Sequence, residues 1–251
     1  MAKLLHFEFH KLIRQKSFYI CMAVAVAMLV VSTCTTYLIN KDVMDTAEMG
    51  IDAMNVMIGS ASGGVLSMVI GVFIPLFACE DYVSGTIRNI VTRGYSRLGI
   101  FSAKLIAVML ATTVMTIACM AAGYLIGLIF SGSGVEPFDA NTVNILLCQL
   151  AVMLAEGALF YAISTVLQKT GGSIAVCLVL PMVLTIVLTL TDTALAEKDI
   201  SLSAYWLERI SGTLSSFDVK SADMKKALLT ALGYFVVTSA GSFLAVMKRE
   251  Y

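Results

Sequence analysis

Residues 61–79, ASGGVLSMVIGVFIPLFAC, lead directly into residues 80–97, EDYVSGTIRNIVTRGYSR. The first stretch carries no charged side chain, and its length is close to the roughly 20 residues that a helix needs to cross a bilayer. The second stretch holds five charged side chains and is too polar to cross. This pairing predicts a membrane protein whose chain leaves the bilayer close to residue 80.

The composition of the whole chain supports the same class. Of its 251 residues, 59% are hydrophobic and 14% are charged, and the mean hydropathy is +0.89. Soluble domains contain about 45–50% apolar and about 25% charged residues, so an ordinary soluble protein is excluded. We expect an all-α polytopic membrane protein that forms one domain over residues 1–251. Its six transmembrane helices are predicted at 18–39, 61–79, 105–130, 145–167, 173–191 and 227–247.

Positive charges divide unevenly between the two sides of these spans. Lysines and arginines concentrate around both termini, in residues 80–104 and at Lys169, whereas acidic residues predominate in the connections on the other side. Because cytoplasmic loops are enriched in lysine and arginine, both termini and residues 80–104 are expected in the cytoplasm. An even number of spans returns the chain to its starting side, as this orientation requires.

The N-terminal residues 2–16, AKLLHFEFHKLIRQK, predict an interfacial helix on the cytoplasmic leaflet. Its apolar stripe consists of Leu5, Phe9, Leu12 and Ile13, and its polar side of Lys3, His10, Lys11 and Arg14. The alternative is a basic flank of a signal anchor. Leu4 and Phe7 lie off the stripe, which suggests a cover by another protein. His6 and His10 are one turn apart, but no third ligand is visible, and no metal site is expected.

Two further segments outside the expected spans show helical apolar faces. Residues 40–60 are either a helical extension of the second span or an adaptable methionine-rich surface for cargo. Their apolar face comprises Val43, Ala47, Ile51, Met54 and Ile58. Residues 192–226 form the longest extracellular segment, with a helix expected over 201–217 at or within the outer membrane surface. The apolar face of that helix comprises Leu202, Trp206, Ile210, Leu214 and Phe217.

The chain lacks the motifs of several enzyme classes. No Gly-Lys pair occurs, which excludes a P-loop, and neither an H-E-x-x-H nor a G-x-S-x-G motif is present. The six cysteines lie in apolar runs and are expected to be small buried side chains, without disulfides or metal. No catalytic residue and no cofactor are therefore expected in this chain.

Glu156 is the one charged residue deep inside a predicted span. An acid in the bilayer is costly, so it should face the bundle or a wet cavity. Gln149 lies seven residues earlier on nearly the same face, and Gly157 allows a close helix approach. Gln149 and Glu156 are candidates for a transport pathway or a subunit interface. The alternative is an interhelical hydrogen bond without a transport role.

Residues 81–93 alternate polar and apolar side chains at helical spacing. Val83, Ile87, Ile90 and Val91 share one side, Arg88 and Asn89 the other, and Gly85 and Gly94 mark the centre and the end. This segment is too short and too charged to span the membrane, and it is too apolar for a bare linker. It predicts a short cytoplasmic helix that docks onto a partner.

Residues 78–104, ACEDYVSGTIRNIVTRGYSRLGIFSAK, resemble the segment after the second span of ABC-2 type permeases, the membrane subunits of ATP-driven exporters. The matching positions are Glu80, Gly85–Thr86, Arg88, Ser96–Arg97 and Lys104. The opening LLHFEFHKLIRQKSFY is also similar to that family. The short external segments look like those of compact bacterial permeases that export peptides and toxins, such as phenol-soluble modulins.

This resemblance implies a homodimer in membrane lipid above two separate ATPase subunits, which would hold ATP and Mg²⁺. Residues 80–97 would be the coupling helix, with partner-binding residues Glu80, Asp81, Val83, Gly85, Thr86, Ile87, Arg88, Ile90, Arg93 and Arg97. The expected function is export of amphipathic or hydrophobic cargo, chiefly peptides. One alternative is a proton-coupled secondary transporter that uses Glu156, with helices broken near Pro75 and Pro181. Another is a non-transporting immunity or assembly protein.

Overall fold

The computed structural model describes residues 2–43, 53–62, 64–92, 94–130, 140–194, 201–215, 219 and 221–248. Within these ranges the chain is helical, without strands, and six helical segments are long and apolar enough to cross a membrane. This confirms the predicted all-α polytopic fold. The elements are α1 (Ala2–Arg14), α2 (Lys16–Val43), α3 (Ala53–Ala61), α4 (Gly64–Val83), α5 (Thr86–Thr92), α6 (Arg97–Phe130), α7 (Ala140–Leu167), α8 (Thr170–Ala194), η2 (Ser203–Tyr205), α9 (Leu207–Leu214) and α10 (Ser221–Lys248).

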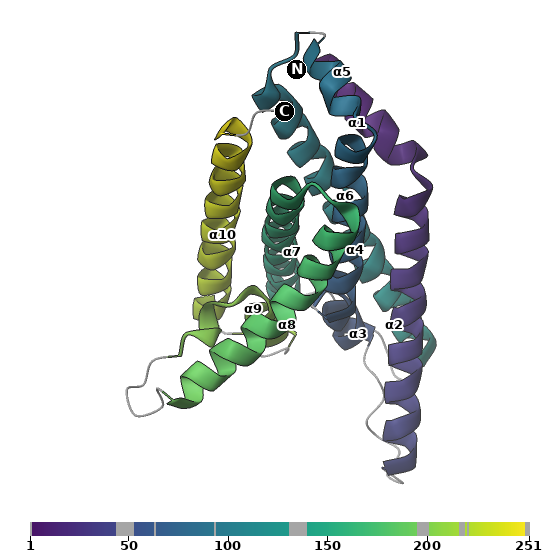
Figure 1. Ribbon diagram of the computed structural model, residues 1–251. Coiled ribbons are helices and arrows are strands. Elements are labelled where there is room, and N and C mark those ends of the chain that lie inside the picture. Colours follow the sequence, from purple (N-terminus) through teal and green to yellow (C-terminus); the bar gives the residue numbers. More distant parts are fainter. Residues whose placement is uncertain are drawn as a thin grey trace.

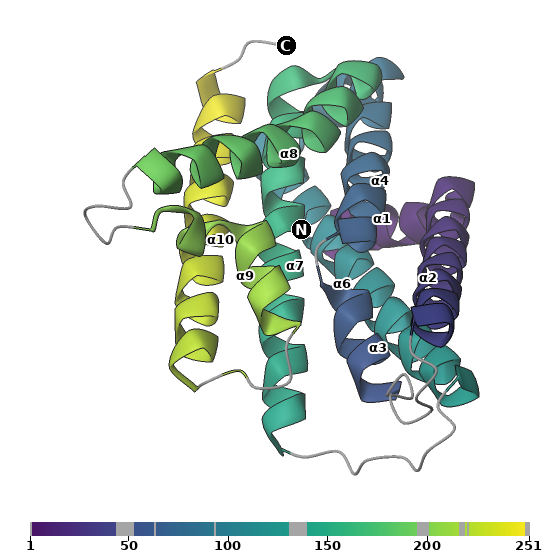
Figure 2. The same ribbon diagram turned by 90° about the horizontal axis from the view of Figure 1, so that it is seen from below.

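The long helices form a central group with flanking helices on either side (Figure 1). Helices α4, α6 and α7 occupy the centre, α2 lies at one edge, and α8 and α10 lie at the other (Figure 2). The buried share of the most apolar stretch is 65% in the span Ala53–Val83 and 11% in the span Thr170–Ala194. The outer helices therefore turn most of their apolar surface away from the bundle, where lipid or another protein chain would cover it.

The second span is longer than predicted and is broken. Helices α3 and α4 together form the span Ala53–Val83, with an interruption that begins at Ser62. There the backbone N–H of Ser62 donates to the carbonyl of Gly59 at 3.1 Å, and the carbonyl of Ile58 accepts instead from the side-chain amide of Gln149 at 3.0 Å. A side chain of α7 thus satisfies a carbonyl that the break would otherwise leave unpaired in the membrane.

Helix α3 confirms the expected helical extension of the second span over its described part. Met54, Met57 and Ile58 are buried against α6 and α7, so these methionines do not form the open cargo surface that was the alternative. Residues 44–52 and the side chain of Val43 lie outside the described part of the structure. The close packing depends on two glycines of α6: a Cβ on Gly127 would lie 2.5 Å from the Cα of Ala53, and one on Gly123 would lie 2.7 Å from the Oγ of Ser60.

The described part of the segment between α8 and α10 packs against the long helices. The helix expected over 201–217 is split into η2 and α9, which lies against α7 and α10 (Figure 2). Trp206, Ile210 and Leu214 of the expected apolar face are buried within the protein, whereas Leu202 is exposed. Phe217 lies outside the described residues. Packing of α9 against α7 and α10 therefore buries the apolar face of this short helix.

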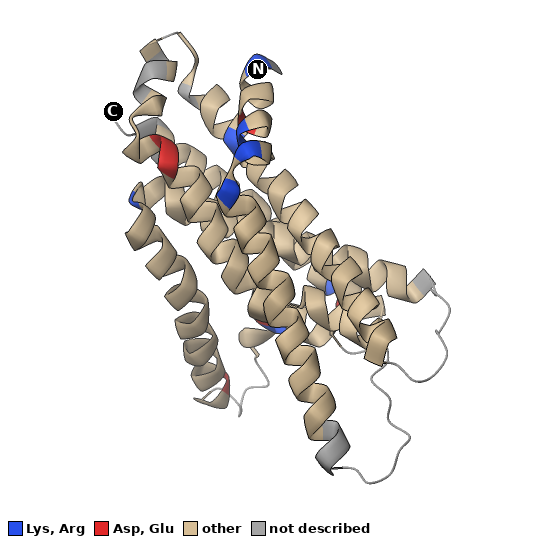
Figure 3. Ribbon diagram, turned by 90° about the vertical axis from the view of Figure 1, so that its right-hand side faces the viewer, with Lys and Arg blue, Asp and Glu red and all other residues tan. Residues whose placement is uncertain are grey.

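Both termini lie at the same end of the bundle, as six spans require (Figure 1). The long helices between the two ends are almost free of charge, and several lysines and arginines lie near the end that carries the N-terminus (Figure 3). Helices α4 and α8 continue through Pro75 and Pro181, so neither proline breaks its helix. The break that does occur lies at Ser62, in the serine- and glycine-rich stretch before α4.

Candidate functional site

A group of charged side chains joins α1, the end of α4 and the beginning of α6. The ammonium of Lys104 pairs with Asp81, and the ammonium of Lys11 lies 2.5 Å from Asp81 Oδ1 and 3.0 Å from Glu80 Oε2. Glu8 completes the group, with its Oε1 at 3.9 Å from the Nζ of Lys104. We call these five residues the ionic junction.

Most of the ionic junction is buried. The side chains of Glu8, Asp81 and Lys104 expose 1%, 5% and 2% of their surface, whereas Glu80 exposes 52%. The ring of Phe77 lies within 5.4 Å of the Lys11 ammonium and within 5.7 Å of the Lys104 ammonium. Buried ions depend on their partners because the surrounding protein solvates them poorly, and an aromatic face adds attraction for cations. The junction therefore holds α1, α4 and α6 in one arrangement.

Two groups of α1 show how unequal the pairing is. Burial raises the pKa of Glu8, and the nearby charge of Lys104 only partly opposes this rise. Neither oxygen of the Glu8 carboxyl accepts a hydrogen bond from the described residues. Burial alone would lower the pKa of Lys11, but its hydrogen bonds and charge interactions with Asp81 and Glu80 raise it. Lys11 is firmly ionised, whereas the Glu8 carboxylate is the weakly held member.

The predicted cytoplasmic helix starts later than expected. Helix α4 runs to Val83, and the chain then turns at Gly85, whose φ of +70° favours glycine. The hydroxyls of Ser84 and Thr86 lie 2.8 Å apart across this turn, and α5 covers only Thr86–Thr92. The single helix predicted over 81–93 is therefore wrong, because the left-handed residue ends α4 and reorients the chain.

The apolar face of this segment is only partly available to a partner. Ile87 is buried within the chain, and Ile90 packs against the cluster of Leu4, Ile100 and Ala103. The expectation that both isoleucines are free to dock is corrected, because Ile87 is buried within the chain and α1 and α6 cover Ile90. Among the described side chains of this apolar face, Val83 remains open at the turn, with 70% of its surface exposed.

The charged residues of the same segment divide in a similar way. Asp81 was expected at the rim of a partner contact, but it is buried in the ionic junction. Glu80 is half exposed and pairs with Lys11. Arg88 lies in α5 and Arg97 opens α6, but their side chains are outside the described part, as is Arg93.

Helix α1 packs with a different face from the one predicted. Leu4, Glu8 and Leu12, spaced one turn apart, are buried against the bundle, while Phe9 and Ile13 are exposed. The prediction placed Leu4 off the apolar stripe and Lys11 on the polar side; both instead face the protein. Leu4 is covered by α6 of its own chain, so its apolar side chain does not require the cover by another protein that was expected. The rings of His6 and His10 stack with centroids 6.4 Å apart.

The second candidate site lies inside the bundle. Glu156 on α7 is 3% exposed and accepts a hydrogen bond from the Ser67 hydroxyl on α4. A Cβ on Gly157 would meet the Thr112 hydroxyl at 3.0 Å, so the predicted close helix approach is confirmed. Gln149 is fully buried, and its Oε1 has no hydrogen-bond partner among the described residues. The bundle thus encloses both side chains. Glu156 contacts α4, whereas Gln149 contacts α3.

Sequence reasoning missed the contribution of α1 to the ionic junction. Glu8 sits between Leu4 and Leu12 on one helical face, and an acid flanked in this way is a signal for a buried partner. Lys104 was noted only as a position matching a family pattern. Its place inside a long apolar run is the signal that it requires a carboxylate, here Asp81.

The comparisons agree with this geometry. A family profile described as ABC-2 family transporter protein matches residues 4–192, which includes α1, the ionic junction, α5 and the first five spans. A comparison with curated proteins finds no match. The profile covers most of the chain, and the structure supplies six membrane-spanning helices. The chain therefore belongs to the ABC-2 transporter family and is a multi-pass permease of the plasma membrane.

Proposed function

We propose that this chain is the permease subunit of an ATP-driven exporter of amphipathic or hydrophobic peptides. Two copies would form the membrane part, and two ATPase subunits would bind ATP and Mg²⁺ beneath them. The observation that carries the proposal is the ionic junction, which connects the α4–α5 turn to α1 and α6. A partner that binds this turn acts on two central spans at once.

A displacement of the α4–α5 turn would reach the spans through the peptide backbone and through the ion pairs of the ionic junction. Val83 and Ser84 are exposed at the turn, and Asp81 lies less than one helical turn before them. Lys104 lies about two turns into α6, so the Asp81 pair ties the two helices together at the membrane boundary. Displacement of the turn by an ATPase would therefore move α4 and α6 as one unit, rather than bend a loose loop.

The outer surface of the bundle supports a dimer. Apolar side chains on one face of α8 are well exposed, and α10 shows the same pattern. A second copy could cover part of this surface, and lipid would cover the rest. Apolar cargo would then meet apolar walls between two subunits. The cargo assignment rests on this character and on the absence of lysine, arginine, aspartate and glutamate from the middle of both helices.

Reconstitution tests the proposal. Proteoliposomes would contain this chain and a candidate ABC ATPase subunit, together with a fluorescent amphipathic peptide. We expect peptide movement that requires ATP, and its loss in Gly85→Pro, because proline cannot adopt a φ of +70°. Gly85→Asn is the matched control, since asparagine tolerates the left-handed conformation, and it should retain transport.

The same preparation separates the second candidate function, a proton-coupled transporter that uses the buried Glu156. Peptide movement driven by a pH gradient without ATP, and lost in Glu156→Gln, would replace the proposal with that alternative. Failure of the chain to associate with the ATPase, with no transport under either driving force, would favour an immunity or assembly protein instead.

A further inference from the structure

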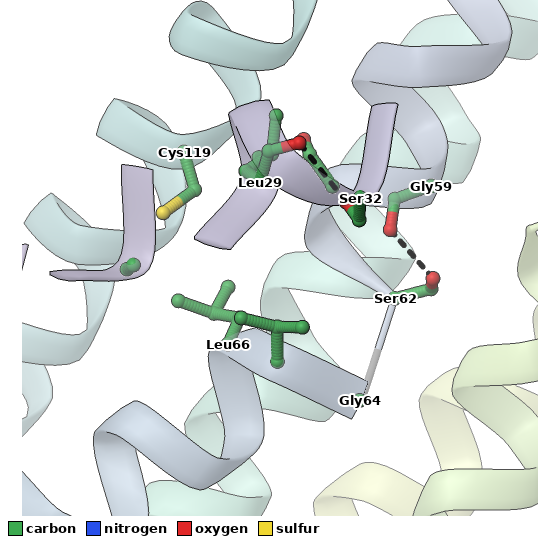
Figure 4. Close-up of a pocket in the computed structure, with 10 residues that line it drawn as sticks. Leu29, Ser32, Gly59, Ser62, Gly64, Leu66 and Cys119 are labelled. Carbon is green, nitrogen blue, oxygen red and sulfur yellow. Dashed lines mark hydrogen bonds between the residues drawn. The ribbon is translucent and has the colours of Figure 1, made fainter. Parts of the chain in front are cut away.

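A cavity of about 250 Å³ lies beside the break in the second span. Helix α2 contributes Leu29 and Ser32, the break contributes Ser62 and the residues around it, and α6 contributes Cys119 (Figure 4). Leu29 lies roughly 20 Å along α2 from Lys16, well inside the membrane-spanning part. The full lining is Ala25, Leu29, Ser32, Gly59, Ser60, Ser62, Gly64, Val65, Leu66 and Cys119.

The cavity has an apolar floor and a polar edge. Ala25, Leu29, Leu66 and Cys119 are buried side chains, whereas Ser32, Gly59 and Gly64 are exposed and mark its opening. The break makes this space, because the glycines beside it carry no side chain to fill the volume between α2 and α6. A Cβ on either Gly59 or Gly64 would meet no atom within 4 Å.

The three serines present one kind of hydrogen-bonding group. Each hydroxyl donates its proton to its own helix: Ser32 to Leu29 at 2.9 Å, Ser60 to Met57 at 2.7 Å and Ser62 to Gly59 at 2.6 Å. A hydroxyl that has donated its single proton can still accept. The cavity therefore offers acceptors next to apolar walls, and it favours a ligand with a donor and no acceptor of its own.

We propose that this cavity binds a planar apolar ring that carries a single N–H donor, the chemistry of an indole. An apolar cavity of about 150 Å³ is enough to hold benzene, so the larger volume here accommodates a fused ring pair. An indole N–H donates and does not accept, which matches the serine edge. The ring could belong to a free aromatic compound or to a tryptophan of a peptide. The second source rests on the proposed function, whereas binding of the ring does not.

Cys119 reports occupancy of the cavity. In a variant that retains only this cysteine, a small membrane-permeant methanethiosulfonate would modify its thiol, which lines the cavity and is 1% exposed. Free indole at twice its dissociation constant should slow the modification about threefold, as mass action requires. 1-Methylindole lacks the donor and should bind roughly fivefold more weakly. Equal protection by both compounds, or protection by neither, would overturn the proposal.

Filling the cavity provides the structural control. Gly59→Phe and Gly64→Phe should abolish protection by indole, because each ring would enter the open space. Gly241→Phe, at another glycine whose Cβ would meet no atom but which lies on α10, should leave protection unchanged. Protection that persists in both filled variants while they keep the melting temperature of the parent would place the ligand elsewhere and contradict the assignment.

Two peptides separate the possible sources of the ring. They are amphipathic helices identical except for one tryptophan or one phenylalanine, added to the same Cys119 preparation. Protection by free indole and by the tryptophan peptide, but not by the phenylalanine peptide, assigns the site to cargo side chains. Protection by free indole alone assigns it to small aromatic compounds and leaves the exporter proposal to its own ATP-dependent test.

Discussion

The two ends of the second span are held by opposite means. At one end Asp81 binds the ammonium groups of Lys11 and Lys104, so charge fixes the position of α4. At the other end α3 lies against Gly127 of α6 at backbone distance, and Gln149 holds one carbonyl at the break. The charged end belongs to the proposed contact with an ATPase, and the glycine end opens into the cavity beside α2.

This difference shows how one span can be both firmly attached and adaptable. Buried ion pairs are intolerant of a missing partner because the remaining charge is left without solvation. Contacts between small residues depend on close approach of the two backbones and involve no buried charge. A movement that enters at the charged end would therefore be transmitted intact along α4, and the break after Ser62 is where it can be absorbed.

Removing the cation at the charged end should have the largest effect. Lys104→Met leaves the buried carboxylates of Asp81 and Glu8 without their nearest positive partner. We expect a loss of about 3–5 kcal/mol of stability, measured as a lower melting temperature of the purified protein. Lys225→Met, at an exposed lysine of α10, should change stability by less than about 0.5 kcal/mol.

A double variant shows whether the effect arises from the pair. Adding Glu8→Gln to Lys104→Met removes the buried carboxylate whose ion pair with Lys104 is lost, while Asp81 keeps its pair with Lys11, and should recover part of the lost stability, as contacting residues are not additive. Independent, additive losses would mean that the two side chains stabilise the protein separately and that the ionic junction does not act as a unit.

Adding a side chain at the glycine contact between α3 and α6 should have an intermediate effect on stability. Gly127→Ala places a methyl group 2.5 Å from the Cα of Ala53, and because backbone must move, we expect a cost of about 1–3 kcal/mol. Gly241→Ala has open space at its Cβ, so it should be neutral or stabilise the helix by up to about 1 kcal/mol. Equal melting temperatures for the two variants would show that α3 does not depend on this close approach.

The smallest effect is expected between the two ends, at Glu156. An amide oxygen can accept the hydrogen bond from Ser67 as the carboxylate does, so Glu156→Gln should alter stability by under about 1 kcal/mol. ATP-dependent transport should also persist. Near-wild-type folding combined with abolished transport would give this residue a role in the pathway that its enclosed position does not predict.

The spans were predictable because length and hydropathy alone determine them. The break in the second span was not, since the sequence ASGG at 61–64 lies inside an apolar run, and the supporting amide of Gln149 comes from a distant helix. The close packing of α3 had a readable signal in Gly123 and Gly127, four residues apart on α6. That spacing does not reveal which helix is the partner.

The sequence located the candidate site, but the helical projection assigned several of its side chains to the wrong face of their helix. Hydropathy assigns Lys11 to the polar side of α1, and a helical projection shows no partner for Glu8. The bundle supplies Asp81 for Lys11 and Lys104 for Glu8. The same cause hid Asp81 from solvent. Ile87 was expected to await a partner, but α5 folds back on its own chain after Gly85. Pairing between distant segments decides such details, and a helical projection does not contain it.

We propose that an ATPase engages this permease at the exposed turn after α4. The most direct test is co-purification of the ATPase with Val83→Asp, compared with Leu202→Asp at an exposed apolar residue of the segment between α8 and α10. We predict that Val83→Asp loses most of the bound ATPase at an unchanged melting temperature, while Leu202→Asp retains it. Retention of the full ATPase complement and of ATP-dependent transport by Val83→Asp would contradict the account.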